Sequence, residues 1–406
     1  MKKIKWLVAI LIVANLLLGV IGCKDPEIHI HTYSEAWTKD ETNHWHAATC
    51  GHTTEVSGKA AHYFGDWTVT KEATCTQEGK KTVYCTDCEY EKEETIPAKG
   101  HYGIWEITKE PTETESGQMQ CLCEVCGKTV TKELQPAPEG FRFVKGGTIT
   151  GTESWTPSSD VFVSGRSLTI PDLIVSNHEV TRDEYKAVMG SDPSTAGAYD
   201  KDGNELEGDS VLNNPVNYVN WYDAIVYCNK LSMQENLKPC YRIDGSTDPD
   251  DWGEVPYRYD DPRRTTWDAA TCDFNANGYR LPTEAEWEWL ARGGENYEYA
   301  GSDNVDDVAW YTSNTNDTGT REVKTKAPNG YGLYDMSGNV WEWCWDWYGS
   351  ISSSSAADGA ASGDFRVQRG GSWYYGDYGC PVAYSVHIFP NFLNHDYGFR
   401  VVRLSN

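Results

Sequence analysis

The sequence predicts an α+β fold with little regular secondary structure, preceded by small repeats that contain Cys and His. Cys-x-x-Cys pairs recur in the N-terminal third of the chain, where aliphatic residues are scarce. From about residue 140 onwards, short helix-start signals are separated by long stretches rich in Gly, Asn and Trp. The chain has 406 residues, of which 39% are hydrophobic, so it is long enough for more than one domain.

The charge balance excludes one class of partner. The formal net charge is −26, whereas affinity for nucleic acid comes from Lys and Arg side chains that neutralise phosphate. We therefore expect no nucleic-acid partner. The 17 Trp and 25 Tyr residues are typical of recognition surfaces, because their rings offer large contact areas at little entropic cost.

The N-terminus has the order of an export signal. Lys2, Lys3 and Lys5 precede an apolar run over residues 6–18, which is too short to span a membrane comfortably. Residues 20–23, Val-Ile-Gly-Cys, resemble a bacterial lipobox. This predicts a lipoprotein signal peptide over residues 1–22 and a lipidated Cys23 as the mature N-terminus. The expected location is a bacterial outer membrane or cell surface, with the lipid as the only membrane contact. A cleaved signal followed by an incidental Cys is the alternative.

Residues 23–139 contain three small units. His62-Tyr-Phe-Gly-Asp-Trp67 recurs as His101-Tyr-Gly-Ile-Trp105, and the pair Cys85 and Cys88 recurs as Cys123 and Cys126. A degenerate first unit begins near His31 and contains Cys50. Units of this size cannot bury much core, so each needs a crosslink or a metal. They resemble the stalk-like Cys/His repeats of bacterial surface proteins, and residues 135–139 are typical of a linker.

Two kinds of crosslink remain open for these repeats. Cys75, Cys85, Cys88 and a His could complete one tetrahedral zinc site. The other units break the pattern, because Ala47 and Glu113 stand where each should repeat Cys75. Disulfides are the alternative in an exported protein. We expect a structural role in either case rather than a catalytic one.

Residues 140–406 carry an ordered series of motifs. Thr181 with Glu184, and Thr283 with Glu286, have the spacing of capping boxes, and Asn220 is a candidate cap of another helix. Further motifs occupy residues 214–224, 277–292, 329–343, 367–373 and 397–403. Trp341 and Trp343, which lie in the third of these motifs, are expected in the core.

This order of motifs resembles the formylglycine-generating enzyme (sulfatase-modifying factor) family over residues 140–406. The resemblance implies a C-type-lectin-like domain of short helices, scattered strands and long ordered loops. It also implies a copper site of two cysteines after Gly-Gly-Ser, used to oxidise a substrate cysteine. Cys380 matches the second cysteine, but the first falls on Tyr375. A phenol cannot supply the thiolate that Cu(I) prefers, so we expect no enzyme activity. The other cysteines of the domain are expected to be buried or paired, namely Cys228, Cys240, Cys272 and Cys344.

The resemblance also implies a structural calcium ion. In the family, a side-chain oxygen, two carbonyls and a Glu surround the Gly-Asn-x-Trp-Glu turn. The matching residues here are Asp335, Gly338, Val340 and Glu342. Carboxylate and carbonyl oxygens suit Ca²⁺. The alternative is a solvated turn in which Glu342 binds the backbone.

Residues 374–397 lack Lys, Glu, Gln, Met and Trp, although Glu and Lys are common in ordinary exposed segments. This segment and its flanks, Arg369-Gly-Gly-Ser-Trp373 and Gly398-Phe-Arg400, resemble the variable regions of diversity-generating retroelements. There, adenine mutagenesis turns AAY codons into NNY, which cannot encode those five residue types. A chance gap in a loop-rich edge of the fold is the alternative.

The resemblance implies a ligand-binding surface on a rigid domain, which fits a surface-anchored binding protein whose ligand is a protein or peptide. The alternative function is a formylglycine-generating enzyme, or a related oxidase with altered metal ligands. The residues predicted to bind the ligand are Tyr374, Tyr375, Tyr378, His387, Phe389, Phe392, His395, Asp396 and Tyr397.

Overall fold

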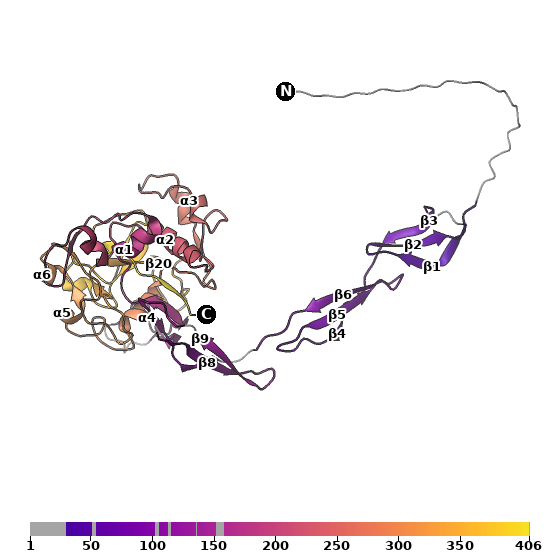
Figure 1. Cartoon of the computed structure of the whole chain (residues 1–406), viewed down its shortest axis with the longest axis horizontal. Helices are drawn as coiled ribbons and strands as arrows, with labels where there is room; N and C mark the ends of the chain where they lie inside the picture. Colours follow the sequence, from indigo (N-terminus) through magenta and orange to yellow (C-terminus); the bar gives the residue numbers. More distant parts are fainter. Residues whose placement is uncertain are drawn as a thin grey trace, which may run out of the picture. The chain divides into compact units, whose positions relative to one another are not determined.

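A computed structural model describes residues 30–50, 54–101, 105–112, 115–134, 136–151 and 158–405. The predicted signal peptide and Cys23 lie outside these residues. The chain divides into two compact units (Figure 1). Unit 1 comprises residues 1–102 and 123–127, and unit 2 comprises residues 103–122 and 128–406. In the described part of the chain, no helix combines the length and apolar character that crossing a membrane requires.

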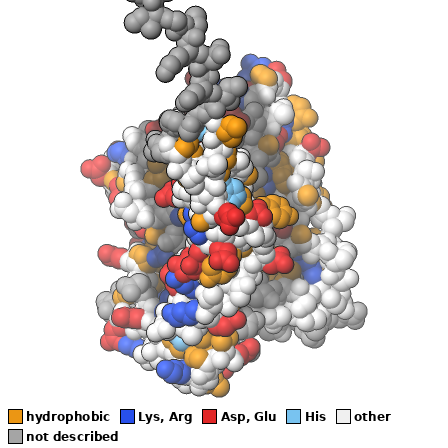
Figure 2. All heavy atoms as spheres, turned by 90° about the vertical axis from the view of Figure 1, so that its right-hand side faces the viewer, with side chains coloured by type: hydrophobic (Ala, Val, Ile, Leu, Met, Phe, Trp, Pro, Cys, Tyr) orange, Lys and Arg blue, Asp and Glu red, His pale blue; other side chains and the backbone are white. Residues whose placement is uncertain are grey.

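The repeats are three-stranded antiparallel sheets with very small cores. Repeat 1 consists of β1 (Tyr33–Lys39), β2 (Asn43–Ala48) and β3 (Val56–Ala61). Repeat 2 consists of β4 (Thr68–Lys71), β5 (Gly79–Tyr84) and β6 (Glu91–Ile96), and repeat 3 of β7 (Trp105–Lys109), β8 (Gly117–Leu122) and β9 (Thr129–Leu134). Acidic and basic side chains are interspersed on the face that Figure 2 shows. Exposed pairs such as Lys81–Glu94 contribute to this pattern, and surface pairs of this kind add little stability.

The strands of repeat 3 group with unit 2, N-terminal to the expected domain start at residue 140. The remainder of unit 2 is mixed α+β (Figure 1). Its peripheral strands form small sheets. One joins β10 (Phe141–Val144), β13 (Leu173–Ser176) and β24 (Val402–Leu404). The two-stranded ones join β11 (Gly147–Thr150) to β12 (Ser167–Ile170), β14 (Gly197–Tyr199) to β18 (Gly319–Arg321), β15 (Tyr241–Arg242) to β16 (Thr271–Cys272) and β17 (Ala309–Trp310) to β19 (Ser337–Gly338).

The main helices begin at the residues that the sequence predicts. Capping boxes at Thr181 and Thr283 open α1 (Arg182–Met189) and α4 (Glu284–Arg292), and Asn220 caps α2 (Trp221–Gln234). Each capping side chain accepts a hydrogen bond from a backbone amide that the helix itself leaves without a partner. The shorter helices are α3 (Arg264–Asp268), α5 (Val305–Val308) and α6 (Thr312–Thr315), with 3-10 turns η1 (Gly208–Asn213), η2 (Pro249–Asp251) and η3 (Asp377–Gly379).

A four-stranded sheet includes strands from the segment that the sequence predicts to bind the ligand. Its order is β22 (Ser385–Ile388), β21 (Arg366–Arg369), β20 (Trp341–Trp347) and β23 (Tyr397–Gly398). Trp341 and Trp343 of β20 are 1% and 0% exposed, which confirms that both belong to the core. Beside them, the Arg366 guanidinium lies 3.7 Å from the Trp221 ring centroid and 3.5 Å from that of Trp347. Such stacking helps a cation to be buried among rings.

Candidate ligand-binding surface

We call residues 369–373 and 398–403 the frame, and residues 374–397 the variable segment. The frame is built from strands at both ends. Strand β21 ends at Arg369, and β23 pairs in parallel with β20 through Tyr397–Trp341 and Gly398–Glu342. Gly370 and Gly371 have φ values of 97° and 81°. These left-handed conformations favour glycine, which explains the paired glycines where the chain leaves β21.

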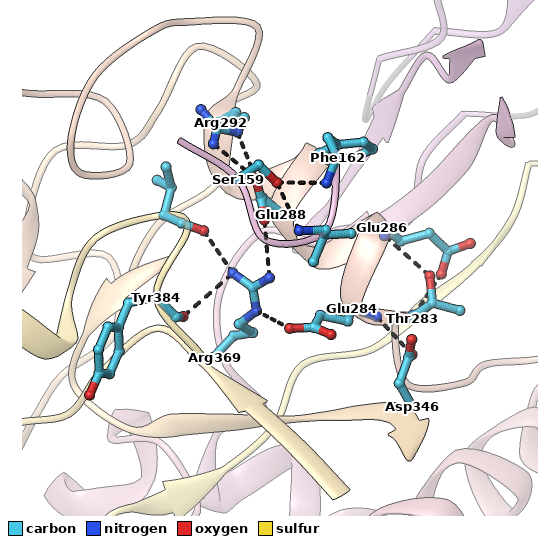
Figure 3. Close-up of polar contacts among 12 residues, drawn as sticks. Ser159, Phe162, Thr283, Glu284, Glu286, Glu288, Arg292, Asp346, Arg369 and Tyr384 are labelled. Carbon is cyan, nitrogen blue, oxygen red and sulfur yellow. Dashed lines mark hydrogen bonds and ion pairs between the residues drawn. The ribbon is translucent and has the colours of Figure 1, made fainter. Parts of the chain in front are cut away.

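Arg369 connects this frame to α4 and to the variable segment (Figure 3). Its guanidinium is fully buried and forms ion pairs with Glu284 at 2.9 Å and Glu288 at 3.0 Å. The same group donates to the carbonyl oxygens of Val382 at 3.0 Å and Tyr384 at 3.4 Å. It therefore holds the middle of the variable segment through main-chain atoms alone, so the side chain at position 384 does not enter the contact.

Further anchors of the variable segment also use its backbone. The carbonyls of Tyr375 and Pro390 accept from the amides of Thr312 and Trp221, at 2.9 Å and 3.0 Å. The Val382 amide donates to the Glu298 carbonyl at 3.0 Å. Main-chain groups are the same for every residue type except Pro, which lacks the donor. The path of the segment is consequently supported without dependence on most of its side chains.

Several predicted ligand-binding side chains point outward. Tyr374, Tyr378 and Phe392 are 49%, 61% and 46% exposed, and His387 is also exposed. Three more predicted residues of the same segment are half-buried, namely Tyr375, Phe389 and His395. Conversely, Cys380, Val382 and Pro390 are buried.

Two of the predicted ligand-binding residues, Asp396 and Tyr397, are buried rather than exposed. Asp396 is fully buried and accepts a hydrogen bond from the Ser372 hydroxyl at 2.7 Å. Tyr397 is 8% exposed and packs edge-on against Trp343 at 5.8 Å. Both residues are fixed by the start of β23, where the segment re-enters the sheet, so they support the surface rather than meet a ligand.

The surface extends to aromatic residues that were not predicted from the sequence. The Tyr348 ring stacks on His387 at 3.7 Å, and the Tyr259 ring meets Phe389 edge-on at 4.7 Å. Tyr348 and Tyr259 are 46% and 62% exposed. Within the variable segment, Tyr384 is also exposed, at 38%. Tyr384 could have been found from its residue type alone, whereas the other two come from distant parts of the chain and needed the fold.

The position of the family's copper pair does not fit copper. Cys380 is fully buried, and burial together with the negative charge of Asp377 raises the pKa of its thiol to about 12. Tyr375 stands at the other position, half-buried and edge-on to Trp341 at 5.5 Å. A neutral buried thiol and a phenol do not make the thiolate pair that Cu(I) prefers.

The four predicted calcium-binding residues are buried together around the β19–β20 turn. The carboxylate of Glu342 pairs with the Arg400 guanidinium at 2.5 Å and accepts from the Trp287 indole at 2.7 Å. Asp335 accepts from the Lys324 amide through one oxygen, while its Oδ1 is buried without a hydrogen-bond partner among the described residues.

The buried carboxyl groups around this turn favour a cation, whereas the ion pair of Glu342 with Arg400 does not. Burial, reinforced by the charges of Asp335 and Glu342, raises the pKa of Glu179 well above its ordinary value. Burial likewise raises the pKa of Asp335 to about 6. An ion at Asp335 Oδ1 and the turn carbonyls would relieve this repulsion, while Glu342 would have to be shared with Arg400. The calcium site therefore stays a prediction.

Among the described residues, eight Cys and His side chains of the repeats form two clusters, both in unit 1. One contains His44, His62, Cys85 and Cys88, and the other contains Cys75, His101, Cys123 and Cys126. The structure does not place Cys75 with Cys85 and Cys88, the grouping that the zinc alternative considered. Cys75 lies between β4 and β5, and its sulfur is 3.7 Å from that of Cys123, whose Cys-x-x-Cys pair follows β8.

Known proteins resemble unit 2 over most of its length. The model of the sulfatase-modifying factor enzyme 1-like domain matches residues 127–405. The solved structure of Treponema denticola variable protein 1 is 31% identical, has a TM-score of 0.54 and covers 74% of this chain and 99% of its own. A protein of Paenibacillus barcinonensis named chaperone protein LppX is 37% identical over 260 residues, which are 59% of this chain and 83% of that protein.

An enzyme of the family also matches. The formylglycine-generating enzyme of Streptomyces coelicolor is 38% identical over 156 residues, which are 33% of this chain and 50% of the enzyme. The chain thus spans half the length of that enzyme. The match to the family model covers more than half of this chain. It agrees with the α+β architecture and with the order of the motifs. The chain belongs to the sulfatase-modifying factor enzyme 1-like (formylglycine-generating enzyme) family.

Proposed function

We propose that this protein is an exported, lipid-anchored binding protein whose variable segment displays a diversified site for protein ligands. The observation that carries the proposal is the separation of roles within residues 374–397. The anchors to the rest of the fold are largely backbone atoms, as with Arg369 and the carbonyls of Val382 and Tyr384. The side chains that face outward are free to change without removing those anchors.

The composition of the segment agrees with this separation. All five residue types that an NNY codon cannot encode are missing from its 24 positions. The 31% identity to Treponema denticola variable protein 1 adds support, because that protein is named for variability.

The chemistry of the surface favours a protein or peptide ligand. Exposed Tyr374, Tyr378 and Phe392 offer rigid aromatic area, and His387 adds a polar group. Aromatic residues are enriched at the energetic centres of protein interfaces, and tyrosine-rich loops serve antibodies in the same way. The neighbouring rings of Tyr348 and Tyr259 enlarge the surface with side chains that lie outside the variable segment.

The proposal is tested by reading folding and binding in parallel. A protein-fragment library displayed on phage is panned against the natural domain to obtain a ligand. Tyr374→Ser, Tyr378→Ser, His387→Asn and Phe392→Ser are then made singly and together. We expect each single change to alter the free energy of unfolding by less than about 1 kcal/mol, since surface substitutions usually do, and the combined variant to lose the selected ligand.

Substitutions of two buried residues, one in the frame and one at the end of the variable segment, are the matched controls. Trp373→Ser and Tyr397→Ser remove buried rings and should destabilise by about 3–5 kcal/mol, as other large-to-small core changes do. Unfolding by most of the exposed-site changes would show that the segment is core and would overturn the proposal. Retention of the selected ligand by the combined variant would place its site elsewhere on the domain.

The enzyme alternative has its own test. Because Tyr375 and the buried Cys380 do not offer two thiolates, copper-loaded protein should leave the cysteine of a Cys-x-Pro-x-Arg peptide unchanged, as judged by mass spectrometry. Formation of formylglycine in that peptide would replace the binding-protein proposal with an oxidase.

A further inference from the structure

We propose that the repeats bind two zinc ions and that each ion fastens one repeat to the Cys-x-x-Cys pair of the next. Site 1 is formed by His44, His62, Cys85 and Cys88. Site 2 is formed by Cys75, His101, Cys123 and Cys126. The inference concerns unit 1 and is independent of the function proposed for the variable segment.

The spacing of the donor atoms is that of a zinc tetrahedron. With Zn–S near 2.3 Å and Zn–N near 2.0 Å, tetrahedral geometry separates two sulfurs by about 3.8 Å, a sulfur and a nitrogen by about 3.5 Å, and two nitrogens by about 3.3 Å. In site 1, the Nδ1 atoms of His44 and His62 are 3.5 Å apart. Cys85 Sγ is 3.7 Å from His44 Nδ1, and Cys88 Sγ is 3.3 Å from His62 Nδ1.

Site 2 shows the same separations with a different donor set. The sulfurs of Cys75 and Cys123 are 3.7 Å apart, and Cys126 Sγ is 3.6 Å from His101 Nδ1. A disulfide would bring two sulfurs to about 2.0 Å, so the Cys75–Cys123 distance is that of two thiolates on one metal. Three sulfurs and one imidazole form a common structural zinc site.

The second ring nitrogen of a site 1 histidine also has a contact that is typical of metal sites. Metal-binding histidines usually donate their second ring N–H to a carbonyl or carboxylate. His62 Nε2 lies within hydrogen-bond distance of the Asp40 carbonyl oxygen, at 2.8 Å, whereas His44 Nε2 lies 3.9 Å from the Asp87 carboxylate, which is beyond that distance.

The ligands come from successive repeats. In site 1, His44 belongs to β2 of repeat 1, while Cys85 and Cys88 follow β5 of repeat 2. In site 2, Cys75 lies in the β4–β5 connection of repeat 2, and Cys123 and Cys126 follow β8. Glu113 replaces Cys75 in the last repeat, which has no following Cys-x-x-Cys pair to join. The departure from a strict repeat thus has a structural reason.

The repeats have little else to hold them together. In repeat 2, the buried hydrophobic residues are Ala73, Cys75, Val83, Cys85 and Cys88, and three of these are zinc ligands. Lys39 adds a hydrogen bond from repeat 1 to the Cys88 carbonyl at 3.0 Å. Since so small an apolar core cannot offset the entropy of ordering a unit of this size, metal binding supplies the folding free energy.

The experiment measures zinc bound to the full chain, purified with zinc and without chelators. Elemental analysis should give at least two equivalents of zinc. Cys88→Ser and Cys126→Ser should each lose one equivalent, and the double variant two. Cys272→Ser, a half-buried cysteine of unit 2, and His46→Ala, two positions from His44 on β2, are matched controls that should retain the wild-type content.

Cobalt substitution separates the two sites independently of stoichiometry. Tetrahedral Co²⁺ with three thiolates absorbs more strongly in the sulfur-to-cobalt region than Co²⁺ with two, so Cys126→Ser should remove more of this absorbance than Cys88→Ser. The thermal transition of unit 2 reports whether each variant still contains a folded C-terminal domain. The proposal would be overturned if wild-type protein contained no zinc and its mass spectra showed Cys85–Cys88 or Cys75–Cys123 disulfides. It would also be overturned if Cys88→Ser and Cys126→Ser removed the same cobalt absorbance, because both cysteines would then bind one ion.

Discussion

Arg369 shows how a single residue limits what this fold tolerates. Its buried guanidinium meets two carboxylates, of Glu284 and Glu288, and two carbonyls of the variable segment. Removing one partner of a buried ion pair leaves the other charge without compensation, which costs more than the pair itself contributes.

We predict that Arg369→Met lowers the free energy of unfolding by about 3–5 kcal/mol, the usual cost of breaking a buried pair. Denaturant unfolding measures the change. Arg258→Met is the control, because Arg258 pairs with Asp260 on the surface, where such pairs contribute at most about 1 kcal/mol. Equal effects of the two substitutions would contradict the role given to Arg369.

The carboxyl group of Asp223 should make the stability of the domain depend on pH. Burial raises its pKa to about 6, although the Asn220 amide and the Tyr257 hydroxyl donate to it. A folded-state pKa above the unfolded value means that the native protein binds the extra proton between those two values. The stabilisation is therefore complete below about pH 4 and is lost as the pH rises through 6.

The corresponding experiment compares wild type with Asp223→Asn, which keeps an acceptor at the helix N-terminus. The free energy of unfolding of wild type relative to the variant should fall by up to about 3 kcal/mol between pH 4 and pH 7. Urea unfolding at several pH values gives this difference. A difference that does not change with pH would show that the folded pKa is close to the ordinary one.

At the scale of elements, the sequence was most informative where a local rule determines the structure. Thr181, Asn220 and Thr283 begin helices as their spacing predicts, because capping depends on residues within one turn. The burial of Asp396 and the neighbours of Cys75 could not be predicted locally, since both depend on segments distant in the sequence. Codon composition delimits a segment but does not say which of its side chains enter the sheet.

The β19–β20 turn is the predicted calcium site, and calcium binding there should change the melting temperature of the domain. If Asp335 and the carbonyls of Gly338 and Val340 bind calcium, excess Ca²⁺ should raise the melting temperature of the domain relative to chelator, since ligands of the native state stabilise it. Asp335→Asn is a suitable control because Asn tolerates the φ of 55° found there. A melting temperature that does not respond to calcium in wild type would remove this site.

At the scale of the whole molecule, attachment is predicted by the sequence alone, because Cys23 lies outside the described residues. Cys23→Ser should move the protein from the membrane to the soluble fraction, as fractionation and immunoblotting would show, since the lipid is the expected anchor. Retention of the variant in the membrane fraction would indicate another means of attachment.

The family and the position of the variable segment could also be predicted from sequence, because ordered motifs identify the domain and missing residue types mark the segment. The extent of the candidate ligand-binding surface could not be predicted from the sequence. Tyr259 and Tyr348 reach it from loops far along the chain, and no local pattern connects them with His387 or Phe389.

The place of β22 bears on the solubility of sequence variants of this segment. This strand lies at the edge of its sheet, inside the variable segment, and edge strands can pair with other chains and start aggregation. It is only four residues long, with Pro381 and Pro390 on either side, and short strands are poor templates for such pairing. If the segment is diversified as proposed, this short edge strand should limit pairing between chains, and altered sequences that gain a long apolar run are expected to aggregate.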